Sequence, residues 1–401
     1  MILTGKFFDW LHMNILADVK LHFFVSLLFF ASNCISSEVL PHKEPRHYRV
    51  RVLLQETEVG TQCEWKLSSS EGFILVDPAM KTKNKIEAKE LLVTGKKNHF
   101  LINGLRFDQK KIYVCPIKGH IKYNDKEYQG SFLLVRDAQS HYLINSLDIE
   151  DYVCSVLRTE SWPGWPLEVN KVFAIASRSY VIGVILNNKA STLPYHVRNT
   201  NKHQTYSGVH TDPVLKDAVE QTKGIFLVHN KKPIVAMFDS CCGGVVPAHI
   251  HGVNFTHAPY LARDYACTYC KDCRVYAWTA AYPIDYIETL FKKEHKNLKN
   301  ILHIKVAKTD KAGLVQHVHV KGGKRNYTIH GKRVYSMLDK VRSHYFDIVF
   351  DAKTVTINGK GIGHHLGLCQ WGAREMVRLG FNYKAILNFY YPGTQFMRLQ
   401  G

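Results

Sequence analysis

The sequence predicts an α+β fold, in which a β-rich N-terminal region precedes a mixed α+β domain. Short apolar runs separated by turn residues fill residues 46–140 and favour strands. After residue 150, apolar residues recur at the spacing of a helix. The composition supports a packed chain, because 46% of the 401 residues are hydrophobic and only 22% are charged. We therefore divide the chain into an N-terminal segment (1–38), a β-rich region (39–140) and a mixed domain (141–401).

The N-terminal segment predicts export. Lys20 precedes an apolar stretch, residues 21–31, and small polar residues follow it, which is the order of parts in a signal peptide. The stretch is shorter than the roughly 20 apolar residues of a comfortable membrane span. An uncleaved membrane anchor, or a lipid on Cys34, is the alternative. We expect the rest of the protein in the periplasm or cell envelope, and an uncleaved segment would anchor it to the inner membrane. Because apolar runs of about 18 residues are absent, a polytopic membrane protein is excluded.

The β-rich region has four segments in which β-branched and aromatic residues alternate with other types. Turn signals separate them, including Asn124-Asp125 and Gln129-Gly130. The predicted strands cover residues 48–54, 72–76, 111–115 and 131–135.

The mixed domain predicts several helices. One starts near Asp151, and Pro166 suits the first position of a long helix that runs to about residue 188. Near the end of the chain, a helix over residues 368–379 should stop at Gly380, and Asn382 can cap another that runs to residue 390.

The charge predicts a polyanionic partner. Lys and Arg number 53 against 34 Asp and Glu, which gives a net charge of +19. Residues 271–360 carry 18 Lys and Arg against 8 Asp and Glu, so 18 − 8 = +10 of that charge lies in this stretch. Nucleic acid, an anionic membrane and an acidic polysaccharide are all partners of this kind. Composition alone does not choose among them.

Glu160 is a candidate catalytic acid. It lies in a loop between two predicted helices, beside Trp162, Trp165 and two prolines. Apolar surroundings disfavour the charged form of a carboxyl group and raise its pKa, as a general acid near neutral pH requires. Indole faces also suit the apolar faces of sugar rings. The simpler interpretation is a Glu that stabilises the N-terminus of the next helix.

Four blocks of sequence resemble the stage II sporulation protein D family. In that family a Glu is followed by a Lys that opens a K-A-x-A-x-A-A-R-[TS]-Y-like helix, and Lys171 stands eleven residues after Glu160. Departures are Ser161-Trp162 for Met-Pro, His365 for Gly, Leu368 for Met and Cys369 for Ser. The matching blocks are residues 160–180 with their lead-in at 147–153, and residues 203–208, 361–373 and 390–394.

The resemblance implies an enzyme that cleaves peptidoglycan strands, with Glu160 as its catalytic residue. Within the matched blocks we expect substrate contacts from Lys171, Arg178 and Gln204. The glycine-rich loop that starts at Gly361 would face Glu160 across a substrate groove, with His364 and Gln370 as further substrate-binding residues. The alternative is a tight structural loop, in which the His364 side chain is buried and forms its hydrogen bonds with backbone groups.

The cysteines predict a structural metal site. Half of the ten lie in the segment 238–278, with spacing that suits tetrahedral zinc. Some family members hold zinc through a His and a Cys of an H-S-x-C-G-G stretch and two later cysteines, and Asp239 stands at the His position. We therefore expect Cys242, Cys267 and Cys270 as ligands of a structural zinc, with a fourth ligand among Asp239, Cys241 and Cys273. Disulfides are the alternative, since an exported protein permits them.

The expected activity is lytic transglycosylation between MurNAc and GlcNAc. Glu160 would protonate the glycosidic oxygen and then accept a proton from the C6 hydroxyl of muramic acid. The positive charge favours strands whose stem peptides an amidase has removed, because their lactyl carboxylates are free. A non-catalytic, wall-binding enhancer of an N-acetylmuramoyl-L-alanine amidase is the alternative. We do not expect nucleic acid as a partner, because the chain is predicted to be exported and its sequence has no nucleic-acid-binding motif. A Cys369–His364 peptidase pair is disfavoured, since five residues of separation do not by themselves activate a thiol.

Overall fold

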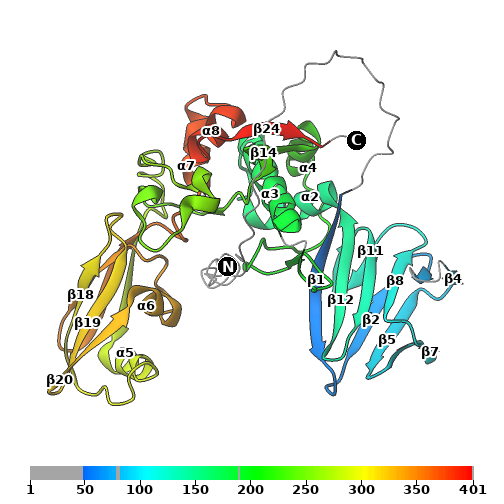
Figure 1. Cartoon of the computed structure of the whole chain (residues 1–401), viewed down its shortest axis with the longest axis horizontal. Helices are drawn as coiled ribbons and strands as arrows, with labels where there is room; N and C mark the ends of the chain where they lie inside the picture. Colours follow the sequence, from blue (N-terminus) through cyan, green and yellow to red (C-terminus); the bar gives the residue numbers. More distant parts are fainter. Residues whose placement is uncertain (1–47, 78–81, 188–189, 400–401) are drawn as a thin grey trace, which may run out of the picture.

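The computed structural model describes residues 48–77, 82–187 and 190–399, so the predicted signal peptide or anchor lies outside the described residues. Figure 1 shows a β-rich N-terminal part, a central helical part, and a further part that projects on the opposite side of the centre. The predicted α+β class with a β-rich N-terminal region is confirmed.

Two sheets form the N-terminal part and pack against each other, and both are antiparallel except where β13 pairs with β1 in parallel. Tyr123 and Phe132 from opposite sheets contact each other edge to face, with ring centroids 6.3 Å apart. Along the strands buried and exposed residues alternate, as in a strand with one buried face. In spatial order, the first sheet has β13 (Val197–Arg198), β1 (Arg49–Glu58), β12 (Ser140–Asp148), β11 (Ser131–Arg136), β8 (Lys111–Pro116), β3 (Phe73–Asp77) and β4 (Thr82–Ile86). The second has β10 (Lys126–Tyr128), β9 (Ile121–Tyr123), β2 (Glu64–Ser68), β5 (Glu90–Lys96), β6 (His99–Ile102) and β7 (Leu105–Phe107).

The helix α3 (Leu167–Asn187) forms the centre of the molecule. It is buried on nearly all sides, which explains why its sequence is apolar all round rather than amphipathic. Within the described residues it is the helix long and apolar enough to cross a membrane, but most of it is packed inside the protein. Its neighbours are α2 (Ile149–Glu160), α4 (Pro213–Gln221), α7 (Gln370–Arg378), α8 (Tyr383–Tyr390) and a sheet of β15 (Lys232–Pro233), β14 (Ile225–His229) and β24 (Gln395–Arg398).

The cysteine-rich segment is mostly irregular and is fixed by a short pair of parallel strands. In that pair, β16 (Phe238–Asp239) lies beside β23 (Leu368–Cys369), with Asp239 opposite Cys369. Three short 3₁₀ helices follow β16, at Pro247–His249, Phe255–His257 and Pro259–Leu261. The strand pair therefore brings the cysteine-rich segment beside the glycine-rich loop, more than 120 residues later in the chain.

Residues 277–360 form the projecting part, which we call the arm (Figure 1). The arm has its own hydrophobic core, which includes Phe291, Val318 and Val355. Its two ends lie together, because Gly361 N donates to Tyr276 O at 2.7 Å. One sheet has β17 (Ala277–Pro283), β22 (Thr354–Lys360) and β21 (Phe346–Phe350), and the other has β18 (Ile301–Thr309), β19 (Val315–Gly322) and β20 (Arg325–His330). Its helices are α5 (Ile284–Phe291) and α6 (Gly331–Met337).

Candidate active site

A cleft of about 740 Å³ lies where the parts of the molecule meet. Its walls come from the end of α2, the loop at residues 199–205, strand β16, and the glycine-rich loop. The arm contributes Tyr335 from α6. Four of the residues predicted for catalysis or substrate binding line this cleft together: Glu160, Gln204, His364 and Gln370.

Glu160 is the last residue of α2 and faces the cleft. Its Oε1 accepts a hydrogen bond from Thr205 N at 2.9 Å, which fixes the carboxyl group against the loop. Gln370 Nε2 donates to the backbone oxygen of Glu160 at 3.1 Å and ties α7 to the end of α2. Burial raises the pKa of Glu160 above its usual range, and the hydrogen bonds from Thr205 only partly oppose this effect. Burial at the cleft therefore favours the protonated form of Glu160 more than exposure to solvent would.

Tryptophan rings form a wall next to Glu160. Trp162 lines the cleft and stacks on Trp165, with centroids 6.3 Å apart. Trp371, the second residue of α7, packs edge to face against both rings. The guanidinium of Arg274 lies over Trp162, 4.7 Å from the ring centroid. The sequence analysis did not single out Arg274, because its partners come from two distant segments.

The polar side chains of the cleft are fixed by further contacts. Gln204 Oε1 accepts a hydrogen bond from the Tyr152 hydroxyl at 3.0 Å, and its Nε2 has no partner among the described residues. His364 Nδ1 accepts from Leu366 N at 3.1 Å, which assigns the proton of the neutral ring to Nε2. Burial lowers the pKa of His364 to about 4, so the ring is neutral near pH 7. The cleft thus presents neutral hydrogen-bonding groups beside Glu160.

Lys171 and Arg178 do not line the cleft, which corrects the expectation that they bind substrate. Arg178 is fully buried, and its Nε donates to Glu150 Oε1 at 3.0 Å. It also donates to the backbone oxygen of Ile225, so the guanidinium holds α2, α3 and β14 together. Lys171 forms an ion pair with Glu168 at 3.1 Å. The helix motif thus encodes packing at these positions.

Asp239 lies in the cleft wall and not among the clustered thiols, which corrects its expected role as a metal ligand. Its Oδ2 accepts from His365 N at 2.7 Å, while its Oδ1 has no partner among the described residues. Burial raises the pKa of Asp239 well above its usual range. Gly363 packs closely against this side chain at a φ of +128°, where an added Cβ would lie 2.3 Å from the Asp239 Cβ. Only glycine fits there.

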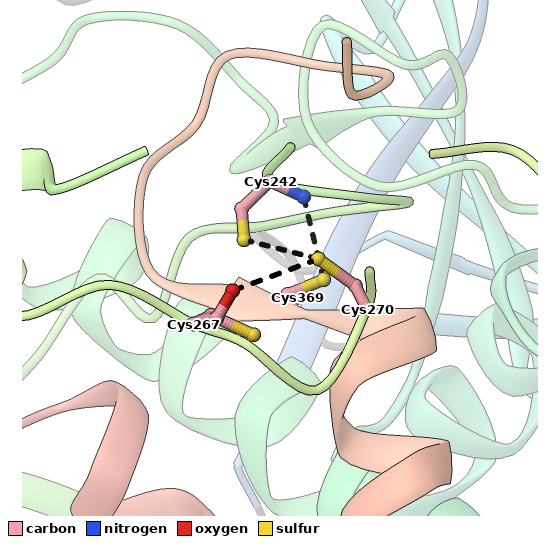
Figure 2. A group of neighbouring side chains, drawn as sticks. All are labelled: Cys242, Cys267, Cys270 and Cys369. Atoms are coloured by element: carbon pink, nitrogen blue, oxygen red, sulfur yellow. Dashed lines mark hydrogen bonds between the residues drawn. The ribbon is translucent and has the colours of Figure 1, made fainter. Parts of the chain in front are cut away.

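Four buried cysteines converge behind the cleft, and Figure 2 shows how their side chains lie. Their sulfur atoms all lie within 4.8 Å of one another. Neighbouring thiols donate hydrogen bonds that lower the pKa of Cys270 below its usual range. Cys369 Sγ accepts from the backbone N–H groups of Cys242 and Gly372, both at 3.3 Å, whereas burial raises the pKa of this thiol well above its usual range. This set of donors fits a closed tetrahedral metal site. Its members are Cys242, Cys267, Cys270 and Cys369.

The fourth member of this cluster, Cys369, was not among the residues proposed from the sequence. Cys241 and Cys273, which were, lie outside the cluster and face each other with their sulfur atoms 3.8 Å apart. Two departures from the family pattern together point to Cys369. A cysteine stands where the family has a serine in the glycine-rich block, and Asp239 stands where the family has a metal-binding histidine. Parallel pairing of β16 and β23 places the two positions opposite each other.

Comparison with known proteins agrees with these features. A family model described as stage II sporulation protein matches residues 137–229, which include Glu160 and Gln204. A second model, described as a domain of unknown function, matches residues 262–367, which include the arm.

Several relatives align along most of the described chain. An uncharacterised protein of Brachyspira hyodysenteriae (strain ATCC 49526 / WA1) is 31% identical over 298 residues, which cover 73% of this chain and 79% of the relative. Stage II sporulation protein D of Bacillus subtilis (strain 168) is 24% identical over 63% of this chain and 75% of its own length. The amidase enhancer of the same strain is 26% identical over 60% of this chain, but only 39% of the enhancer is covered. The chain belongs to the stage II sporulation protein D family.

Proposed function

We propose that the protein cleaves the glycan strand of peptidoglycan between MurNAc and GlcNAc by lytic transglycosylation. The observation that carries the proposal is the enclosed carboxyl group of Glu160, which lies in the cleft beside Trp162 and has a raised pKa. A carboxyl group that stays protonated can serve as a general acid. Family membership relates the protein to the cell wall, which supplies a substrate of this kind.

In the proposed reaction Glu160 acts first as an acid and then as a base. It donates its proton to the glycosidic oxygen as the bond from that oxygen to the anomeric carbon of MurNAc breaks. The C6 hydroxyl of the same sugar then attacks the anomeric carbon, and its proton passes to the Glu160 carboxylate. Hydrolytic glycosidases use a second carboxylate to activate water. Asp239 is poorly suited to that task, because burial disfavours its charged form.

The rest of the cleft suits a sugar substrate. Trp162 offers an aromatic face at the wall, and such faces pack against the apolar faces of sugar rings. His364 and Gln204 also line the cleft and can form hydrogen bonds with hydroxyl or acetamido groups. Gln370 acts mainly through its bond to the backbone of Glu160 and thereby positions the acid.

The charge of the arm favours strands without stem peptides. The arm, residues 277–360, carries 16 Lys and Arg against 7 Asp and Glu, and Tyr335 brings it to the cleft wall. Strands trimmed by an amidase have free lactyl carboxylates, which positive side chains would attract. We therefore propose an amidase as a functional partner, in the periplasm or cell envelope, with residues 1–38 directing export or anchoring the chain.

A structural zinc ion is proposed at the four cysteines. Four buried cysteines can supply all the ligands of a tetrahedral ion, so the site would be closed and would contribute to stability and not to the reaction. Zinc there would fix Cys369, which immediately precedes Gln370, and would thus hold the start of α7 against Glu160.

A second candidate function is a non-catalytic enhancer of an amidase, favoured by the similarity to the amidase enhancer of Bacillus subtilis. The two candidates differ in whether the isolated protein breaks glycosidic bonds.

The test incubates purified protein with amidase-trimmed glycan strands and with no amidase present. The proposal expects release of short saccharides, and Glu160→Gln should lower the rate by at least about 10²-fold, the usual contribution of a general acid. His210→Gln, at a residue outside the cleft, is a control that should stay active. An inactive wild type that still stimulates an amidase would instead support the enhancer.

A further inference from the structure

A second cavity, of about 1070 Å³, adjoins the cleft. We call it the side groove. It lies along β1, the turn between β11 and β12, and the loop that follows β13. Asn199 and Thr200 line both the side groove and the cleft. The two hollows therefore border the same loop, which places both within reach of one linear ligand bound at Glu160.

The side groove is lined mainly by polar side chains. Amide and hydroxyl groups come from Gln55, Gln139, Asn199 and Thr200. Arg198 is not available to a ligand, because its guanidinium forms an ion pair with Glu56 at 3.1 Å and donates a hydrogen bond to the Tyr195 hydroxyl at 2.7 Å.

Two lysines at the side groove remain available to a ligand. Lys97 and Lys202 are exposed, and neither forms an ion pair with another residue in the described ranges. Glu58 is the remaining acidic residue of the lining. The two lysines and Glu58 together therefore give the side groove a net charge of 2 − 1 = +1, once the Arg198–Glu56 pair is set aside. The lining contains no Phe, Tyr or Trp. Single-stranded nucleic acids bind on aromatic platforms, so the lining does not suit them.

We propose that the side groove binds further sugar units of the same acidic polysaccharide strand that Glu160 cleaves. This inference rests on the proposed function for the identity of the strand. Amides and hydroxyls of the lining would bond to sugar hydroxyls, and Lys97 and Lys202 would face carboxylates of the strand. The side groove would thus make the protein select long strands over short fragments.

The experiment uses the full chain carrying Glu160→Gln, so that ligands are bound but not cleaved. Its affinity is measured by calorimetry for trimmed glycan fragments, from a single disaccharide up to long oligomers. The expected result is an affinity that rises with length. Adding Lys97→Gln and Lys202→Gln should weaken binding of long oligomers by about three- to tenfold, the scale of two exposed charge contacts. Binding of the disaccharide should stay unchanged.

The matched control carries Lys216→Gln and Lys384→Gln, which remove the same charge at exposed residues outside both cavities. It should bind long oligomers like the parent. An affinity that does not depend on length, or an equal loss in the control, would overturn the inference even if the wild type cleaves glycan. Length-dependent binding lost only in the side-groove variant would support it, even if the wild type proves not to cleave.

Discussion

At the scale of single residues, the chemistry of the cleft depends on how completely Glu160 is enclosed. No basic side chain pairs with its carboxyl group among the described residues. Burial raises its pKa, and the backbone and side chain of Thr205 lower it by hydrogen bonding to the charged form. On an exposed helix end, without this burial, the same carboxyl group would lack the effect that raises its pKa.

The first prediction concerns pH. An acid must be protonated at the start of the reaction, so kcat/KM should fall as pH rises through the raised pKa of Glu160. The fall should lie above about pH 4.3, the usual pKa of Glu. Thr205→Val removes the hydrogen bond from the Thr205 hydroxyl, which lowers the pKa of Glu160. The fall in kcat/KM should therefore move to higher pH in this variant. A pH–rate profile measures both. A fall at the usual pKa of Glu, or a shift to lower pH in the variant, would show that another group titrates.

Cys369 gives a second prediction at the same scale. Cys369→Ser removes one of the four clustered sulfur atoms but keeps a hydroxyl that can accept from the Gly372 N–H group, so it tests the metal ligand rather than the helix cap. Bound zinc, measured by mass spectrometry of the native protein, should fall from about one per chain, and Tm should fall with it. Cys273→Ser changes a cysteine of the same segment outside the cluster and should keep its zinc. Full zinc occupancy in Cys369→Ser would refute the assignment of the fourth ligand.

At the scale of secondary structure elements, several helices follow directly from local sequence signals. Asn382 caps α8 by accepting from Ala385 N at 3.0 Å, as the sequence predicts. The long helix after Pro166 is also confirmed. The sequence could not show which side of that helix faces the substrate, because α3 is buried on nearly all sides and has no distinct polar face. Local spacing could not separate the residues that face substrate from those that face other helices.

Arg178 on α3 gives the third prediction. Arg178→Ala would leave Glu150, whose side chain is only 17% exposed, without its cationic partner. Losing one member of a buried ion pair costs about 3–5 kcal/mol of unfolding free energy. Urea unfolding should show this loss, whereas Lys171→Ala should cost under about 1 kcal/mol. If Arg178→Ala folds normally and only raises KM, Arg178 binds substrate after all.

At the scale of the whole molecule, the site is assembled from segments that are distant in the chain. The cleft combines the end of α2 with the loop before Gln204, with strand β16 and with Tyr335 of the arm. The family motifs predicted that Glu160, Gln204, His364 and Gln370 share a site, and the structure brings them together. Nothing in the local sequence marks Tyr335, because its place depends on how the arm is attached.

The arm gives the fourth prediction. Because Tyr276 and Gly361 are hydrogen-bonded and most apolar residues of the arm pack in a core of their own, we expect that a short glycine linker can replace residues 277–360. The remaining protein should fold, as judged by Tm and circular dichroism. Its preference for trimmed over peptide-bearing strands should decrease toward unity, since the arm carries 16 − 7 = +9 of the net charge of +19. The ratio of the two cleavage rates is the readout, and an unchanged ratio would remove the arm from substrate selection.

The central claim is that Glu160 promotes transglycosylation and not hydrolysis, and the mass of the products tests it most directly. Trimmed glycan digested by the wild-type protein should give MurNAc ends that carry an anhydro ring, about 18 Da lighter than hydrolysed ends because the C6 hydroxyl replaces water. Mass spectrometry should find these ends in the wild-type digest and not in the Glu160→Gln digest. Hydrolysed ends, or anhydro ends formed equally by both proteins, would contradict the account.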